Sequence, residues 1–122
     1  MGYPVVHFEI NTKAPHELRE FYASAFCWKV GLSDGDGYSM VDTEGVCLGT
    51  GVPGINGGIG SLEEGEGDFV TFYVQVPDPQ ATLDEIEALG GTIDLPITAV
   101  PGGVTFAIFR DPAGNRVGLV KA

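Results

Sequence analysis

The last eighteen residues of the chain, Thr105–Ala122, read TFAIFR, DPAGN, RVGLVKA, and this stretch decides the fold. Two apolar runs rich in β-favouring residues flank a connector of five residues, Asp111–Asn115. In that connector proline fixes φ, glycine permits a positive φ, and Asp and Asn side chains bond their own backbone. We therefore predict a β-hairpin with strands over Val104–Arg110 and Arg116–Val120.

The composition indicates a single domain that works away from nucleic acid and membranes. The chain has 122 residues, 43% of them apolar, and a net charge of −11 from 6 basic and 17 acidic residues. Such a surface repels phosphate backbones and anionic lipid heads. No apolar run approaches the ~20 residues of a membrane span and no signal peptide is recognisable, so we expect a cytoplasmic protein. Cys27 and Cys47 lack a Cys-x-x-Cys spacing and are expected to be reduced and buried.

The first half is predicted to begin with a strand and a helix. Val5–Asn11 alternates, so its two faces differ: one is apolar and the other carries His7, Glu9 and Asn11. Pro15–Phe26 has the spacing of a helix with one buried stripe. That stripe comprises Leu18, Phe21, Tyr22, Ala25 and Phe26.

Short strands and a linker complete this half. β-like runs cover Trp28–Leu32, Gly37–Asp42 and Gly45–Gly49. From Thr50 to Asp68 the composition changes to Gly, Pro, Ser and Glu, which predicts a linker or a lid over a site.

The second half repeats the pattern. Phe69–Val76 reads as a strand and Pro79–Leu89 as a helix, with Leu83, Ile86 and Leu89 on one side and Gly90 and Gly91 after its end. Thr92–Leu95 and the two hairpin strands follow.

A constant offset of 64 residues relates the halves. It places Val6, Phe8, Ile10 and Pro15 on Val70, Phe72, Val74 and Pro79. This is typical of a duplicated supersecondary unit. We predict an α+β fold of two tandem β-α-β-β-β modules, about 1–60 and 61–122, in a single domain over 1–122. Their curved mixed sheets are expected to face each other around a cleft.

This organisation resembles the vicinal oxygen chelate superfamily, which includes glyoxalase I, extradiol dioxygenases, fosfomycin-resistance transferases and bleomycin-binding proteins. The resemblance covers nearly the whole chain. It is carried by Val6–Ile10, by Phe21 to Trp28, by Leu89 to Ile93, and above all by Phe109–Asn115. The chain looks most like the uncharacterised glyoxalase-like branch.

The resemblance also implies where a metal would be bound, on the first and last strand of each half. His7 matches the first position, whereas Thr71 stands at its equivalent and Gly118 replaces the usual final Glu. The last strand of the first half offers Cys47 or Gly49. Because a divalent site needs about three protein donors, these departures argue against the family's metal chemistry.

The leading hypothesis is therefore binding of a small organic molecule without a metal, or an enzyme of unassigned reaction. The expected cleft residues are His7, Glu9, Thr71, Tyr73, Gln75 and Gly118. His7 and Glu9 are also candidates for a general base and its carboxylate partner.

Two alternatives stay open. One is a lyase, isomerase or dioxygenase using Zn, Mn, Fe or Ni on a substrate with vicinal oxygens, with His7 and Glu9 as ligands. The other is a dimeric interaction module without a ligand. A homodimer is expected from the family and from the exposed sheet edges.

Overall fold

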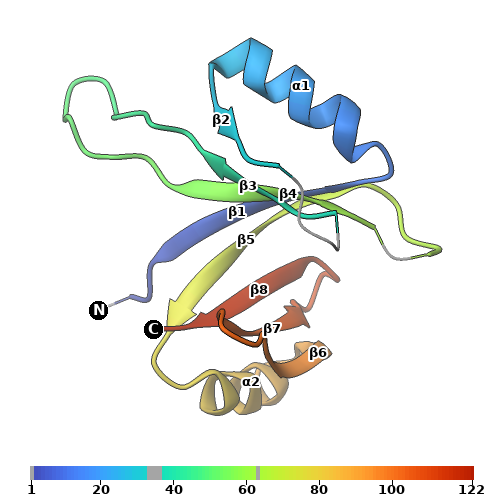
Figure 1. Cartoon of the computed structure of the whole chain (residues 1–122). Helices are drawn as coiled ribbons and strands as arrows, with labels where there is room; N and C mark the ends of the chain where they lie inside the picture. Colours follow the sequence, from blue (N-terminus) through green and yellow to red (C-terminus); the bar gives the residue numbers. More distant parts are fainter. Residues whose placement is uncertain (1, 33–36, 63) are drawn as a thin grey trace. The chain divides into compact units, whose positions relative to one another are not determined.

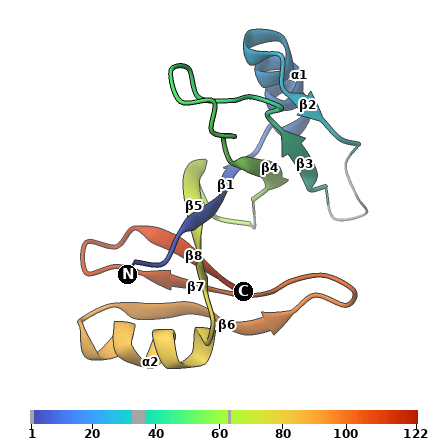
Figure 2. The ribbon, with the colours of Figure 1, turned by 90° about the vertical axis from the view of Figure 1, so that its left-hand side faces the viewer.

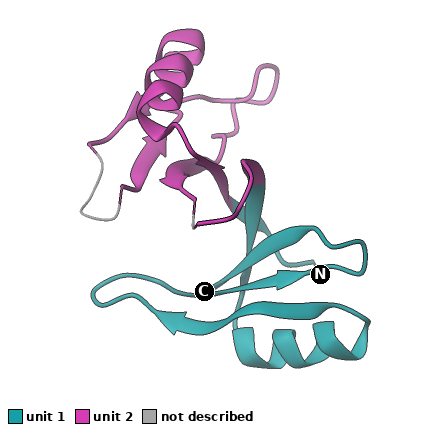
Figure 3. Cartoon of the chain, turned by 90° about the vertical axis from the view of Figure 1, so that its right-hand side faces the viewer, with its two compact units in different colours: residues 1–6, 71–122 teal, residues 7–70 magenta. Residues whose placement is uncertain are grey.

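The protein is described from a computed structural model that covers residues 2–32, 37–62 and 64–122 (Figure 1). It contains two compact units, residues 7–70 and residues 1–6 with 71–122, which are coloured separately in Figure 3. We refer to them as the His7 unit and the hairpin unit. The described elements follow one another in this order: β1 (Val5–Thr12), α1 (Pro15–Phe26), β2 (Lys29–Val30), β3 (Ser39–Asp42), β4 (Asn56–Ser61), β5 (Phe69–Val76), α2 (Pro79–Ala88), β6 (Thr92–Ala99), β7 (Thr105–Arg110) and β8 (Arg116–Lys121).

The His7 unit pairs its strands in the order β2-β3-β4-β1, with α1 on one face (Figure 1). β4 runs parallel to β1 and antiparallel to β3. The core of this unit is formed by Ile10, Val41 and Ile59, and Leu18 and Tyr22 of α1 pack against it. The predicted apolar face of the first strand is thus confirmed for Phe8 and Ile10, which both belong to this cluster.

The hairpin unit has the equivalent order β5-β8-β7-β6, with α2 against it (Figure 2). β8 runs parallel to β5 and antiparallel to β7. Its core contains Val76, Leu83, Ala107 and Leu119. Asp78 caps α2, because its side chain accepts a hydrogen bond from the backbone N–H of Ala81.

The C-terminal hairpin forms as predicted. Asp111 holds its turn: one carboxylate oxygen accepts from the backbone N–H groups of Ala113 and Asn115, and the other accepts from the Asn115 side chain. Gly114 has φ of +92°, a conformation that glycine adopts without strain. The strands flanking the turn pair directly from Arg110 and Arg116 onward.

The duplicated β-α-β-β-β pattern is confirmed. β5 lies 64 residues after β1 and α2 begins 64 residues after α1, as the offset predicts. Each unit, in the residues that the structure describes, combines one helix with a mixed sheet, so the chain has the expected α+β architecture. The arrangement of the two modules around a cleft stays a prediction, as do the single domain and its module boundaries.

The prediction for residues 50–68 was wrong in its central part. Asn56–Ser61 is a strand, β4, that lies between β3 and β1 and is buried over four residues. Its sequence NGGIGS has low strand propensity, but the missing side chains let aromatic rings lie against the backbone. A Cβ at Gly57 would collide with Phe8, and one at Gly58 with Tyr38. Glu63 of this stretch lies outside the described residues.

The run Gly45–Gly49 is likewise no strand. Val46 forms only an isolated bridge with Pro53, and a turn follows it. The edge strand β6 is longer than predicted and continues through Pro96 with two register shifts. An edge strand tolerates proline there because one side of its backbone needs no partner strand.

Several residues that were predicted to be buried are exposed, because the helices bury fewer of their apolar side chains than the apolar spacing suggests. No residue of α1 is fully buried, and Phe21 and Phe26 are 59% and 57% exposed. Ala25 and Leu89 are exposed too. Both cysteines are free and exposed rather than buried: Cys27 ends α1 in a left-handed conformation, and Cys47 lies in the turn after Val46.

Candidate functional site

His7 and Tyr38 form a hydrogen-bonded pair on the face of the His7 unit opposite its core. The Nε2 atom of His7 lies 2.8 Å from the Tyr38 hydroxyl oxygen. His7 belongs to β1, whose alternate residues face the two sides of the sheet, and Tyr38 immediately precedes β3. Residues 31 positions apart in sequence are thus joined by their side chains.

Two glycines of β4 create the space that Tyr38 occupies. Gly58 pairs with Glu9 and Gly60 with Asn11, so both lie on the same face as His7. A Cβ at Gly58 would meet the phenol end of Tyr38, and one at Gly60 would lie 2.9 Å from its ring. The ring therefore rests on backbone that carries no side chain.

Glu9 and Asn11 extend this polar face along β1. The side-chain amide of Asn11 donates a hydrogen bond of 3.0 Å to a Glu9 carboxylate oxygen. Partial burial lowers the pKa of His7, and the nearby Glu9 carboxylate opposes this by raising it. The net direction is downward, so His7 is neutral at physiological pH and able to accept a proton.

In the hairpin unit, the predicted residues Thr71, Tyr73 and Gln75 alternate along β5. Thr71 is buried, and its hydroxyl donates a 2.6 Å hydrogen bond to the backbone carbonyl of Arg116. Tyr73 is 8% exposed and faces Phe106, with ring centroids 6.4 Å apart. Gln75 is half-buried. A ligand role for these residues stays a prediction, and Thr71 already has a structural partner.

Gly118 lies opposite Tyr73 in the pairing of β5 and β8. A Cβ at Gly118 would collide with the Tyr73 ring. Applying the 64-residue offset, the pair Tyr73 and Gly118 corresponds to Glu9 and Gly58 in the His7 unit. The last-strand position of the first half is therefore Gly58, not Cys47 or Gly49 as the sequence suggested.

The donor set for the family metal does not fit this chain. Of its four equivalent positions only His7 is a metal-binding residue type; the others are Thr71, Gly58 and Gly118. The Thr71 hydroxyl is bonded to backbone, and tyrosine rings lie over both glycines. Within the described ranges no cluster of three His, Cys, Asp or Glu side chains is placed to hold a metal ion.

Sequence reasoning missed Tyr38 as a partner of His7. The link was missed because the Gly-rich segment β4 was not predicted to be a strand. In the structure, Gly58 of β4 pairs with Glu9 of β1 and with Met40 of β3.

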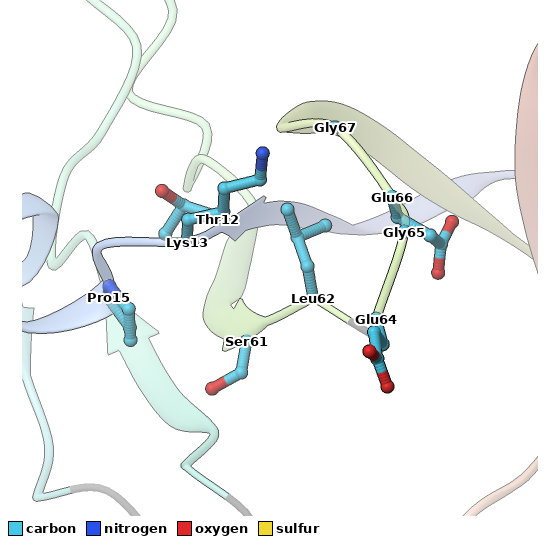
Figure 4. A pocket seen from close by; sticks show the side chains of 9 residues that line it. All are labelled: Thr12, Lys13, Pro15, Ser61, Leu62, Glu64, Gly65, Glu66 and Gly67. Carbon is cyan, nitrogen blue, oxygen red and sulfur yellow. The ribbon is translucent and has the colours of Figure 1, made fainter.

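A separate surface pocket lies at the end of β1, with a volume of about 580 Å³. Figure 4 shows that its lining comes from the start of α1 and from the segment after β4. The lining residues are Thr12, Lys13, Pro15, Ser61, Leu62, Glu64, Gly65, Glu66 and Gly67. It shares no residue with the predicted site.

Among the described helices, none is long and apolar enough to cross a membrane.

Two tandem β-α-β-β-β repeats, each with its first and last strands paired in parallel, define the class of fold that this chain has. Comparison with protein families gives the same result. Residues 5–119 match the model of the Glyoxalase/Bleomycin resistance protein/Dioxygenase superfamily, and the chain belongs to this family.

Solved structures share the fold at low sequence identity. A superfamily member from Vibrio splendidus 12B01 is 14% identical, with a TM-score of 0.66, over 99% of this chain and 100% of that one. A Streptomyces coelicolor methylmalonyl-CoA epimerase in complex with 2-nitronate-propionyl-CoA is 14% identical, with a TM-score of 0.67, over 98% and 97%. The Mn(II)-bound glyoxalase from Novosphingobium aromaticivorans is 15% identical, with a TM-score of 0.66, over 96% of this chain and 38% of that one. Among curated proteins none matches this sequence significantly.

Proposed function

We propose that this chain binds a small organic molecule through the polar faces of its first strands, without the family's metal centre. The predicted ligand-binding residues are His7, Glu9, Thr71, Tyr73, Gln75 and Gly118. The observation that carries this proposal is the replacement of metal donors. Tyrosine rings cover the two last-strand positions, Gly58 and Gly118, so no donor side chain fits there without moving a ring.

The chemistry available at the His7 unit is hydrogen bonding and proton acceptance. A neutral imidazole hydrogen-bonded to a phenol can hold a ligand oxygen or accept a proton from it. Glu9 would stabilise the resulting imidazolium, because its carboxylate raises the pKa of His7.

The test measures metal content and thermal stability together. Protein purified without an affinity tag is dialysed against Zn, Mn, Fe(II) or Ni, and then analysed for bound metal and for its melting temperature. We expect no stoichiometric metal and no rise in the melting temperature, while a screen of organic compounds finds stabilising ligands. His7→Ala is the matched variant, because it removes the only metal-binding residue type at the four positions.

The alternative is a lyase, isomerase or dioxygenase that uses a divalent metal on a substrate with vicinal oxygens. The observation in its favour is His7 itself, which occupies the family's first-strand position. Near-stoichiometric metal that raises the melting temperature, and that is lost in His7→Ala, would establish this alternative and overturn the metal-free proposal.

We also propose that the protein works as a homodimer in the cytoplasm. Its two cysteines are unpaired, which suits a reducing compartment. The turn region after β3 supports a second copy as partner, because Val46, Leu48 and Val52 are exposed there and residues 45–62 carry no charge. Light scattering after size-exclusion chromatography should give about twice the mass of the chain, and a monomer at micromolar concentration would refute the dimer.

A further inference from the structure

The surface pocket at the end of β1 has the size of a small-molecule site. Its volume of about 580 Å³ lies within the usual range for bound organic ligands. All of its lining residues belong to the His7 unit, and none is among the residues proposed above to bind a ligand. The pocket is therefore a candidate for a second binding site.

Hydrogen bonds hold one wall of this pocket in place. The segment after β4 begins at Ser61, which pairs with Thr12 of β1. It ends at Asp68, whose carboxylate accepts hydrogen bonds of 2.7 Å from the Thr12 hydroxyl and 3.0 Å from the Lys13 backbone N–H. Thr12 is 1% exposed, so both ends of the segment are fastened to a buried residue. The pocket is thus formed before a ligand arrives, as most small-molecule sites are.

Groups of opposite charge line the pocket at separate places. Figure 4 shows the Lys13 ammonium and the Glu64 carboxylate pointing away from each other. Within the ranges that the structure describes, no ion pair joins either group to another side chain. Hydrogen bonds lower the pKa of Asp68, and the Lys13 charge adds to this effect, so the ammonium lies near Asp68 without pairing with it. Both charges are accessible to a ligand.

The balance of these charges discriminates between ligands. Two carboxylates, Glu64 and Glu66, line the pocket together with one ammonium, Lys13, on a chain of net charge −11. An anion that lacks a positive group is therefore repelled. A simple cation is attracted by the carboxylates but is opposed by Lys13. A zwitterion with separated charges matches both kinds of group.

Apolar surface lies beside the charged groups. Leu62 and Pro15 line the pocket, and both are half-buried. Covering them with a hydrocarbon side chain of a ligand would remove further apolar area from water. The pocket thus offers a positive group, a negative group and an apolar wall.

We propose that this pocket binds an α-amino acid with an aliphatic side chain. Lys13 pairs with the ligand carboxylate, Glu64 pairs with its ammonium, and Leu62 contacts its side chain. Glu66 makes a further interaction within the chain, so its role is limited to the negative charge that it adds. The inference goes beyond the proposed function and does not depend on it, because the two sites share no residue.

The test uses three probes with one side chain: L-leucine, leucinamide, which lacks the carboxylate, and N-acetyl-leucine, which lacks the ammonium. NMR of the full chain follows the amides of Thr12, Gly65 and Gly67 at the pocket, and of Gly58 on the His7 face. Leucine should perturb the first three and not Gly58. It should bind about two- to fivefold more tightly than leucinamide, the effect of one exposed ion pair. N-acetyl-leucine should bind most weakly, because the acidic chain repels it.

Two variants test the charged residues separately. Lys13→Met keeps the aliphatic stem and should abolish the preference for leucine over leucinamide. Glu64→Gln should reduce the preference for leucine over N-acetyl-leucine about two- to fivefold. The controls are Lys121→Met and Glu87→Gln, which change the net charge equally at exposed positions of the hairpin unit and should leave both preferences unchanged.

The inference is wrong if leucine leaves the pocket amides unperturbed, if it binds no more tightly than leucinamide, or if Lys13→Met keeps the wild-type preference. The ranking of the three probes on the wild type decides even if a variant fails to fold. His7→Ala should bind leucine as the wild type does, so failure of the proposed function leaves this test intact. Leucine that perturbs Gly58 in place of the pocket amides would support the proposed function and refute this inference.

Discussion

The two β-α-β-β-β repeats share one topology but anchor their helices differently. α2 buries Leu83 completely and is capped by Asp78. α1 has no fully buried residue, and no side chain caps its first turn at Ala14. It contacts its sheet through half-buried residues, including Tyr22, whose ring stacks on Trp28 at 5.4 Å. A repeated strand order therefore does not require a repeated mode of packing.

The repeats also differ in how they cover the equivalent glycines. Tyr73 reaches Gly118 from the directly paired position on β5 and is 8% exposed. Tyr38 reaches Gly58 from the residue before β3 and is only half-buried. We therefore expect the Tyr38 ring to move more readily than the Tyr73 ring.

The helix comparison predicts the largest effect on stability. Leu83→Ala should reduce the free energy of unfolding by about 2–5 kcal/mol, because it leaves a cavity in a core that the helix closes. Leu18→Ala in α1 should cost about 1 kcal/mol, since this side chain is only half-buried. Urea denaturation measures both. Equal losses would show that α1 is anchored as firmly as α2.

The glycine comparison predicts a smaller effect. Gly118→Ala should cost about 1–3 kcal/mol, because the buried Tyr73 ring has to move to admit a methyl group. Gly58→Ala should cost less, since the Tyr38 ring is less buried than the Tyr73 ring. It should also separate the phenol from His7.

The control for both glycine variants is Gly67→Ala, where a Cβ meets nothing within 4 Å. It should leave the denaturation midpoint unchanged or slightly higher, because alanine restricts the unfolded chain. A larger loss for Gly58→Ala than for Gly118→Ala would contradict the view that Tyr38 is the more movable ring.

Much of the fold was predictable because its signals are local. The turn Asp111–Asn115 carries its own hydrogen bonds, and the prolines at 15 and 79 begin the two helices. β4 was missed because its burial comes from rings supplied by Phe8 and Tyr38, which are distant in sequence. Strand propensity reflects a residue's own side chain. A glycine-rich strand is instead stabilised by side chains that other segments pack against it, so propensity does not reveal it.

The candidate site was predictable only in part. Alternation along the first strand correctly placed His7 and Glu9 on the face opposite Phe8 and Ile10. The pairing of His7 with Tyr38 depends on the register of β1, β4 and β3, and a strand shifted by one residue would direct Tyr38 to the other face. Register of this kind is not encoded in any short motif.

The two loop aspartates offer a further comparison between the units. Asp68 accepts hydrogen bonds from the Thr12 hydroxyl and the Lys13 backbone, and Asp111 accepts three within its hairpin. These bonds lower the pKa of both carboxyl groups below the ordinary value of 3.8. Their stabilising effect is present above that value and is lost as the pH falls through the lowered pKa.

Asp111→Ala and Asp68→Ala should therefore each lower the melting temperature at neutral pH, with the larger effect at Asp111. The differences from wild type should shrink toward strongly acidic pH, where the carboxyl groups are protonated in the wild type too. Thermal melts at several pH values measure this. A difference that does not depend on pH would mean that the carboxylate charge is unimportant to these loops.

The equivalent positions on the first strands of the two repeats are His7, which can ionise, and Thr71, which cannot. This difference predicts the smallest effect, a change in how stability depends on pH. His7 has a pKa lowered below its ordinary value of 6.5, mainly by burial, whereas its equivalent Thr71 cannot ionise in this range. Because the unfolded chain binds a proton to this histidine more readily than the folded chain, stability should fall as the pH drops below about 6.5 and level off below the folded pKa. His7→Gln should flatten this part of the stability curve. If His7→Gln keeps the wild-type slope, His7 is not held neutral by its surroundings, and the Tyr38 hydroxyl then has a charged partner.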